Sequence, residues 1–332
     1  MGKPVRMADI AERLGISVVS VSKALAGKPG VSEEMRARVV ALARQMGYEG
    51  TKLHCELGGT GNIGVLVSDR FFSENAFYAN LYRALALESG SSGFGCMIEI
   101  VSLEAERERA LPSLLTGHRA DGLIFMGCFD EGYLRAVSAG GVPCLLLDFR
   151  IPGAAWDCVV SDNQDGGYSL TRHLLDRGIR EIGFVGSVLA TSSIMDRFLG
   201  FQQALRTAGV PWREDWLLED RDGDGSFLPL RLPAQLPQAF LCSCDEAAFY
   251  LVQTLRDAGR RVPENVAVCG YDDHRFATLA APHLTTYHVE TGRMAEAAVE
   301  RLTERLRQAD APPVIQIIPG RLVVRESSGG PI

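Results

Sequence analysis

The chain has 332 residues, of which 46% are hydrophobic and 23% are charged. This is the composition of a globular protein, and the length suffices for one small and one large folded unit, each with its own core. No segment reaches the ~18 consecutive apolar residues that a membrane-spanning helix needs. The first residues, MGKPVRMADIAERL, contain no apolar stretch that would mark them for export. We therefore expect a cytoplasmic protein with no membrane partner.

Charge is divided unevenly along the chain. The net charge is −7 overall, but residues 1–48 contain eight Lys and Arg against four Asp and Glu, a net of +4, which leaves −11 for the rest. A basic segment joined to an acidic body is what a nucleic-acid-docking module on a solubilising domain requires. The segment charge therefore favours a nucleic-acid partner, which the charge of the whole chain would argue against.

The sequence contains no pattern typical of a metal site, a cofactor site or an enzyme. The eight cysteines lie mostly in apolar, strand-like stretches and form no C-x-x-C pair, so we expect them to be structural. Asp272, Asp273 and His274 are adjacent, but three neighbours on one turn rarely converge on one ion, and we reject a metal site there. No G-x-S-x-G, H-E-x-x-H, P-loop or strand-linked G-x-G-x-x-G motif occurs. We therefore expect a protein that binds its ligands without catalysis and without a cofactor.

Three short helices are predicted at the N-terminus. Apolar residues at helical spacing predict helices over 7–14, 18–27 and 32–47, with Ser17 and Ser32 as N-caps and Gly15 in the first turn. Two short helices joined by a tight glycine turn are typical of a helix-turn-helix, whose second helix enters the major groove of DNA.

The second helix holds the candidate DNA-contacting residues. Val18 and Val19 lie early in it and would face base edges, while nearby hydroxyl and amino groups would bond phosphates or bases. The predicted DNA-contacting set on this segment is Ser17, Val18, Val19, Ser20, Ser22 and Lys23. The alternative is a small helical bundle with a solvated basic face.

From Asn62 onward, short apolar runs alternate with helix-length amphipathic segments. The runs are IGVLVS, CMIEIV, GLIFM, PCLLLD, EIGFVG, AFLC and VAVCG. The helical segments are 76–90, 103–117, 130–139, 165–178, 194–209 and 245–260. Near-continuous apolar strands separated by helices indicate parallel sheets covered on both faces, and the number of strands favours two sheets.

Motifs spread over nearly the whole chain match one known family. Near the N-terminus they are D-I-A, L-G-I-S, V-S-K-A-L, V-S-E-E, R-x-R-V and the closing G-Y. Further along they are VVSDNQDGGYSLTRHLLDRGIREIGFVG, S-x-x-x-R-x-x-G-F from Ser193 to Phe201, RVPENVAVCGYDD, APHLTTYH and RLVVRESS. With these motifs in this order, the chain resembles the lactose-repressor (LacI/GalR) family, which favours the helix-turn-helix over a generic bundle.

The resemblance implies an α/β architecture in three parts. An all-α headpiece would occupy 1–49, a hinge 50–61, and a two-lobed type I periplasmic-binding-protein-like domain 62–332. The first lobe would take 62–160 and the helix 290–308, and the second lobe 162–288 and the final strands. The implied function is that of a homodimeric repressor of double-stranded operator DNA, controlled by a small sugar-like effector between two Rossmann-like lobes. The alternative is a solute-binding protein of a transport system, against which the headpiece and the missing export signal argue.

The resemblance also implies effector-binding roles for Phe77, Asp162, Arg197 and Asp272. Carboxylates accept hydrogen bonds from vicinal hydroxyls, a guanidinium donates two, and an aromatic ring stacks on the apolar face of a sugar or base. Each residue also has a structural alternative: Phe77 in the core, Asp162 as a helix cap, Arg197 as a solvated charge and Asp272 in a turn.

Two segments depart from the family pattern around this site. Cys244-Asp245 stands where the family usually has Asn-Asp. The segment 218–238 is short and broken by prolines, where the family places a helix after a pocket aromatic. Phe227 is the candidate replacement for that aromatic.

The hinge carries one further DNA-contact prediction. In the family, this segment folds into a short helix on DNA, and paired leucines enter the minor groove. Counting from Gly47-Tyr48 places that leucine at Leu57, a suitable apolar wedge, with Leu53 on the same helical face. Glu56 departs from the family pattern, and the alternative is that 50–61 is a flexible tether.

Overall fold

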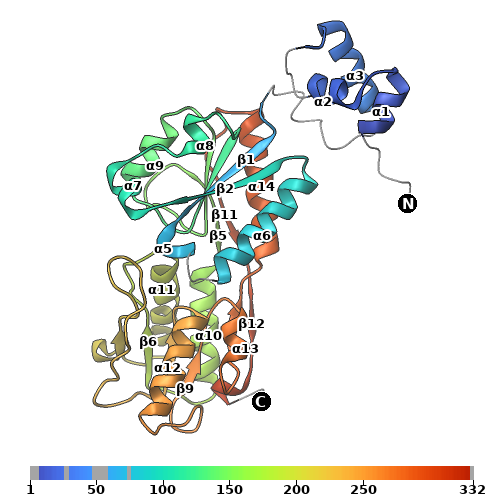
Figure 1. Ribbon diagram of the computed structural model, residues 1–332. Helices are drawn as coiled ribbons and strands as arrows, with labels where there is room; N and C mark the ends of the chain where they lie inside the picture. Colours follow the sequence, from blue (N-terminus) through green and yellow to red (C-terminus); the bar gives the residue numbers. More distant parts are fainter. Residues whose placement is uncertain (1–6, 26–29, 47–58, 73–75, 330–332) are drawn as a thin grey trace.

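The computed structural model describes residues 7–25, 30–46, 59–72 and 76–329. Three helices come first, α1 (Met7–Leu14), α2 (Val18–Leu25) and α3 (Glu33–Met46). They enclose a small core of their own, apart from the sheets in Figure 1. The buried residues of this core are Ile10, Ala11, Val21, Ala24, Leu25, Val39 and Ala43. The three predicted helices are thus confirmed within the described residues.

Local hydrogen bonds and one glycine explain where these helices begin and turn. The Ser17 hydroxyl accepts a hydrogen bond from the amide of Ser20 at 3.0 Å, and the Ser32 hydroxyl accepts one from the amide of Met35 at 3.3 Å. Both predicted N-caps are therefore confirmed. Gly15 joins α1 to α2 at φ +65°, a left-handed conformation that costs a residue with a Cβ about 1–2 kcal/mol.

The first lobe is built on a six-stranded parallel sheet. Its strands in spatial order are β11 (Ile315–Ile318), β5 (Asp157–Ser161), β4 (Cys144–Leu147), β3 (Gly122–Met126), β1 (Asn62–Ser68) and β2 (Gly95–Val101). Its helices are α5 (Asp69–Phe72), α6 (Ala76–Ser91), α7 (Leu103–Glu108), α8 (Ser113–Thr116), α9 (Glu131–Ser138) and α14 (Thr291–Arg307).

Helices cover both faces of this sheet. Along β1, Val65 and Val67 belong to the same core cluster as Leu81 of α6, whereas Leu66 belongs to the cluster that contains Leu134 of α9. Successive strand residues therefore point into two different apolar layers. This is why the predicted strands are apolar throughout instead of alternating.

The second lobe contains a four-stranded parallel sheet and a small antiparallel pair. The strands of the sheet in spatial order are β7 (Leu217–Leu218), β6 (Ile182–Val185), β8 (Ala239–Cys242) and β9 (Ala267–Cys269). The antiparallel pair is β10 (Thr286–His288) with β12 (Arg321–Val323). The helices are α10 (Asn163–Asp176), α11 (Ser192–Thr207), α12 (Asp245–Asp257) and α13 (Arg275–Leu279).

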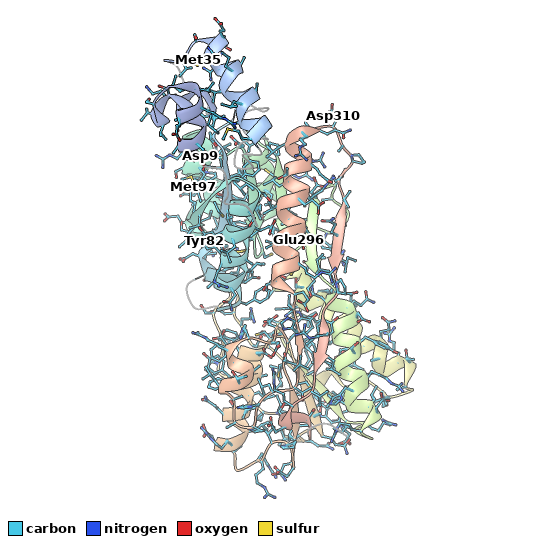
Figure 2. All side chains as sticks on the ribbon, turned by 90° about the vertical axis from the view of Figure 1, so that its right-hand side faces the viewer. Asp9, Met35, Tyr82, Met97, Glu296 and Asp310 are labelled. Carbon is cyan, nitrogen blue, oxygen red and sulfur yellow. The ribbon has the colours of Figure 1, made fainter. Side chains whose placement is uncertain are left out.

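The chain passes between the lobes three times, after β5, after β10 and after β11. Figure 1 shows the result for α14, which is coloured like the C-terminal elements yet lies beside α6 of the first lobe. In the turned view of Figure 2, the same helix, marked by Glu296, again runs along the first lobe. The predicted division into two parallel sheets, with 290–308 returning to the first lobe, is confirmed.

Two predicted details are wrong. The final strands do not both belong to the second lobe, because β11 pairs in parallel with β5 and extends the first sheet. The single helix expected over 103–117 is broken into α7 and α8. Arg109 ends α7 in a left-handed conformation and Pro112 stands before α8, because proline lacks the amide that a continuing helix would need.

Candidate functional site

Helix α2 presents one face to the small core and the other to solvent. Val21, Ala24 and Leu25 are buried. Val18 and Val19 are adjacent and 48% and 64% exposed, which leaves both available for contact. Ser22 and Lys23 are also exposed. The helix therefore offers an apolar tip with polar groups beside it, the arrangement that major-groove readout requires.

Two predicted DNA-contacting residues need separate mention. Besides capping α2, the Ser17 hydroxyl lies 2.9 Å from that of Ser20, so both hydroxyls have a partner within the helix. Ser17 and Ser20 therefore fit phosphate contact through the remaining capacity of their oxygens. Leu57 lies outside the described residues, and its predicted role in the minor groove stays a prediction.

Arg197 stands on α11 at the end of the second lobe that faces the first. Its Nε donates to Oδ1 of Asn163 at 2.8 Å and its Nη1 to the carbonyl of Ser243 at 2.5 Å. Its guanidinium carbon lies 3.8 Å from the centre of the Tyr271 ring. Gly167 makes this placement possible, because a Cβ there would lie 2.1 Å from the carbonyl oxygen of Arg197. The solvated alternative for Arg197 is excluded, since only 6% of the residue is exposed.

Asp272 is the acidic partner of Arg197. Its Oδ1 lies 3.5 Å from Arg197 Nη2, and the residue is buried at φ +105°. Burial raises the pKa of Asp272 to about 6, against the opposing influence of Arg197 and Arg221. Oδ1 is buried and accepts no hydrogen bond from the described residues. Arg197 balances its charge but stands too far away for a short hydrogen bond, so this oxygen keeps capacity to accept one from a ligand.

Asp148 faces this cluster from the first lobe and was not among the residues predicted from the sequence. It follows β4 at φ +70°, and its Oδ2 accepts from the Tyr78 hydroxyl at 2.8 Å. Its pKa rises to about 7, chiefly because the carboxyl is buried, and Arg197 of the other lobe opposes the rise. Its Oδ1, like that of Asp272, is buried without a hydrogen bond from the described residues. An aspartate directly after an apolar strand, in PCLLLD, was the available signal.

The other two predicted effector residues are placed differently. Phe77 is buried, packs edge-on against Tyr78 at 5.2 Å between ring centroids, and lines a hollow of about 500 Å³ together with Asp272. It thus belongs to the core and to the lobe junction at once. The side chain of Asp162 accepts from the amide of Asp165 at 3.1 Å and caps α10, and its carbonyl accepts from the Tyr271 hydroxyl at 3.3 Å. For this side chain, the helix-cap alternative describes what the structure shows.

Two further hollows of about 560 and 590 Å³ open between the lobes on the side of α5. Arg70 and Phe71 of the first lobe and Arg221, Gly225 and Leu228 of the second line both of them. These volumes lie within the usual range for small-molecule sites.

The irregular segment 218–238 forms the outer wall of these hollows. It folds back on itself through a bridge between Arg221 and Phe227, and the Arg221 guanidinium lies 4.7 Å from the Phe227 ring centre. Phe227 also packs against Tyr250 of α12, with ring centroids 5.4 Å apart, and lines one hollow. The structure therefore brings this predicted aromatic to the lobe junction. Cys244 accepts a hydrogen bond from Arg221 there at 3.4 Å.

Within the described residues, no group of three or more metal-binding side chains converges, and no helix is long and apolar enough to cross a membrane.

Comparison with known proteins decides what these parts belong to. Residues 6–50 match the family described as "Bacterial regulatory proteins, lacI family", and residues 171–328 match "Periplasmic binding protein-like domain". The chain is similar to the regulators of the lacI family. It is a transcription regulator with a helix-turn-helix headpiece and a two-lobed ligand-binding domain.

Individual relatives extend along nearly the whole chain. The HTH-type transcriptional repressor PurR of Glaesserella parasuis is 27% identical over 333 residues, covering 96% of this chain and 97% of its own length. That of Pectobacterium carotovorum is 28% identical, covering 97% of each. The solved transcriptional regulator CelR–cellobiose complex is similar with a TM-score of 0.71 and 25% identity over 97% of this chain and 99% of that one. The lac repressor dimer bound to operator and the anti-inducer ONPF superposes with a TM-score of 0.67 at 24% identity, covering 98% and 99%.

Proposed function

We propose that this regulator binds a near-palindromic operator as a homodimer in the cytoplasm, and that a polyhydroxylated, sugar-like effector between its lobes changes the operator affinity. We assign no catalytic step to it. In this proposal the domains divide at the predicted boundaries, 1–49, 50–61 and 62–332. The effector site is centred on Arg197 and Asp272.

The observation that carries the effector site is a pair of buried carboxylate oxygens that accept no hydrogen bond from the described residues. Asp148 Oδ1 comes from the first lobe and Asp272 Oδ1 from the second, where Arg197 Nη2 lies 3.5 Å away as an ion-pair partner. Neighbouring hydroxyls of a sugar are donors in the number and closeness that two carboxylates need. The solved cellobiose complex of a similar regulator supports the same ligand class.

The DNA-binding part of the proposal rests on α2. Its exposed Val18 and Val19 have no hydrogen-bonding groups, so they would select thymine methyl groups by packing, whereas Lys23 would favour guanine or a phosphate. One headpiece covers only a few base pairs. A homodimer doubles the sequence that is read, and a relative of this chain is described as a dimer bound to operator.

Selection from random duplex DNA, followed by fluorescence anisotropy at fixed salt, tests the proposal. We expect enrichment of a near-palindrome and an affinity that falls steeply with salt, because phosphate contacts release counterions. D-glucose and cellobiose, together with their acidic derivatives, are then added to find an effector that shifts the affinity. Failure to enrich any sequence would show that the headpiece does not bind DNA with sequence specificity, and would contradict the proposal.

A further inference from the structure

We infer that the effector of this chain carries an acidic group, a carboxylate or a phosphate, which Arg70 and Arg221 hold between the lobes. This inference rests on the proposed function, because it names the chemical class of the ligand for the interlobe junction. The two hollows adjoin the Arg197 cluster there, since Arg197 donates to the carbonyl of Ser243 and Arg221 to the sulfur of the next residue, Cys244. Two guanidinium groups, that of Arg70 from the first lobe and that of Arg221 from the second, line both hollows on the side of α5.

Arg70 reaches toward the second lobe from the start of α5. Its Nη2 pairs with Oε2 of Glu106 at 2.8 Å, and its Nε donates to the Ser68 hydroxyl at 3.2 Å. Its aliphatic stem borders Gly225 of the second lobe, where a Cβ would approach it at 3.4 Å. Glu106 is only 3% exposed and is not part of the wall of either hollow, so it orients the guanidinium from behind.

Arg221 mirrors this arrangement from the second lobe. Its Nε lies 3.3 Å from Oδ1 of Asp220, which is fully buried and outside both walls. The Phe227 ring and the Cys244 sulfur hold the guanidinium on its other sides. Two arginines fixed by buried carboxylates behind them are pre-organised, so little side-chain entropy is lost when they bind an anion.

The rest of the cavity wall suits a polyol attached to that acid. Phe71, Phe227 and Leu228 supply apolar surface. Four carboxylates supply acceptors for hydroxyls: Glu246 and Asp257 in one hollow, and Glu219 and Asp222 in the other. These carboxylates lie on the second lobe only. Arg70 and Arg221 therefore attract an anion from both lobes. An acidic group that bonds to both guanidinium groups would draw the lobes together.

The experiment compares neutral sugars with their acids on the full chain. Wild-type protein is mixed at millimolar concentration with D-glucose, D-glucuronate, D-galactose, D-galacturonate, D-glucose 6-phosphate or inorganic phosphate. Melting temperature and calorimetric Kd are then recorded. We expect at least one acid to bind at least tenfold more tightly than its neutral partner, since one charge-assisted contact changes Kd by about that factor. Glucuronate against glucose 6-phosphate distinguishes a carboxylate from a phosphate.

Four glutamine variants locate the binding. Arg70→Gln and Arg221→Gln should each weaken the preferred acid about tenfold or more and leave neutral sugars unchanged. Arg135→Gln in the first lobe and Arg172→Gln in the second remove exposed arginines of carboxylate pairs away from the hollows and serve as matched controls. If a glutamine variant does not fold by circular dichroism, the corresponding lysine variant, which keeps the charge but loses the planar fork, should weaken the acid by a smaller factor.

Four results would overturn the inference: no acid or phosphate binding at all, neutral sugars binding as well as acids, acid affinity unchanged in both glutamine variants, or operator affinity shifted by neutral sugars and by no acid. The last result would leave the proposed function intact. Loss of operator selection by the wild-type chain would instead count against the proposed function.

Discussion

Replacing Arg197 with methionine should destabilise the protein in a pH-dependent way. Arg197 is 6% exposed, and its loss leaves the carboxylate of Asp272 without its cation and the side chain of Asn163 and the carbonyl of Ser243 without their donor. Breaking a buried ion pair from one side costs about 3–5 kcal/mol, because the remaining charge is buried unpaired. We expect a loss of that size in the free energy of unfolding near pH 8.

The loss in the free energy of unfolding should be smaller near pH 5 than near pH 8, because the folded pKa of Asp272 decides how much of its carboxyl is charged. An unfolded aspartate ionises near pH 3.9, whereas burial raises the pKa of folded Asp272 to about 6. Between these values the folded state binds more protons than the unfolded state. The contribution of this carboxyl to stability is therefore complete below about pH 4 and falls as the pH rises through about 6. Arg197 lowers the folded pKa of Asp272, so removing it extends this fall to higher pH.

Urea unfolding followed by tryptophan fluorescence, near pH 5 and near pH 8, measures the loss in the free energy of unfolding and its dependence on pH. Arg172→Met removes an exposed pair with Asp176 on the neighbouring helix and should cost at most about 1 kcal/mol. Adding Asp272→Asn to Arg197→Met should restore part of the loss near pH 8, because the unpaired charge disappears. A cost below about 1 kcal/mol for Arg197→Met, equal at both pH values, would refute the buried-pair reasoning.

Four other outcomes are expected. Val18→Ala and Val19→Ala should relax the preference for thymine at the positions they read, by about 1–3 kcal/mol of discrimination at most, as measured by repeated selection and anisotropy. Asp148→Asn should raise stability above pH 7 by up to about 4 kcal/mol and flatten its decline between about pH 4 and pH 7 in calorimetric melts, because the folded pKa of this carboxyl is about 7. Sedimentation at micromolar concentration should give a particle of twice the 36.0 kDa chain mass, and a stable monomer would contradict the homodimer. Leu57→Ala should reduce operator affinity and DNA bending together, whereas binding and bending like those of wild type would favour the tether.

The starts of the first helices and the positions of several strands could be predicted from local sequence patterns. Serine at 17 and 32 before helical spacing placed the N-caps, and the hydrogen bonds to Ser20 and Met35 confirm both. Apolar runs of strand length placed β1, β3 and β4 within a residue or two. These features depend on neighbours along the chain, which a single sequence displays directly.

Features that depend on distant partners were less accessible. The strand β11 follows elements of the second lobe in the sequence, but nothing local indicates that it pairs with β5 and so belongs to the first lobe. The resemblance identified Arg197 and Asp272, whereas Asp148 and Arg221 reach the same junction from segments without a distinctive motif. Asp162 shows a further limit, because a capping residue and a ligand residue of the same type have the same sequence signature.

Several contacts that join the lobes are polar, and this bears on how an effector acts. Arg150 pairs with Asp196 at 2.8 Å, the Ser193 hydroxyl donates to the carbonyl of Asp148 at 2.6 Å, and the exposed Arg107 pairs with Asp224 at 2.9 Å. Water can replace such contacts at little cost when the lobes separate, so they do not by themselves fix one arrangement. A ligand that donates to the buried oxygens of Asp148 and Asp272 binds only where the two lobes meet. Two charge-assisted hydrogen bonds supply about 3–6 kcal/mol, and about 5.5 kcal/mol suffices to invert a 1:99 population. Hydrogen bonds to these two oxygens would therefore invert such a population only at the upper end of their range, and the remaining contacts of the ligand must supply the difference otherwise.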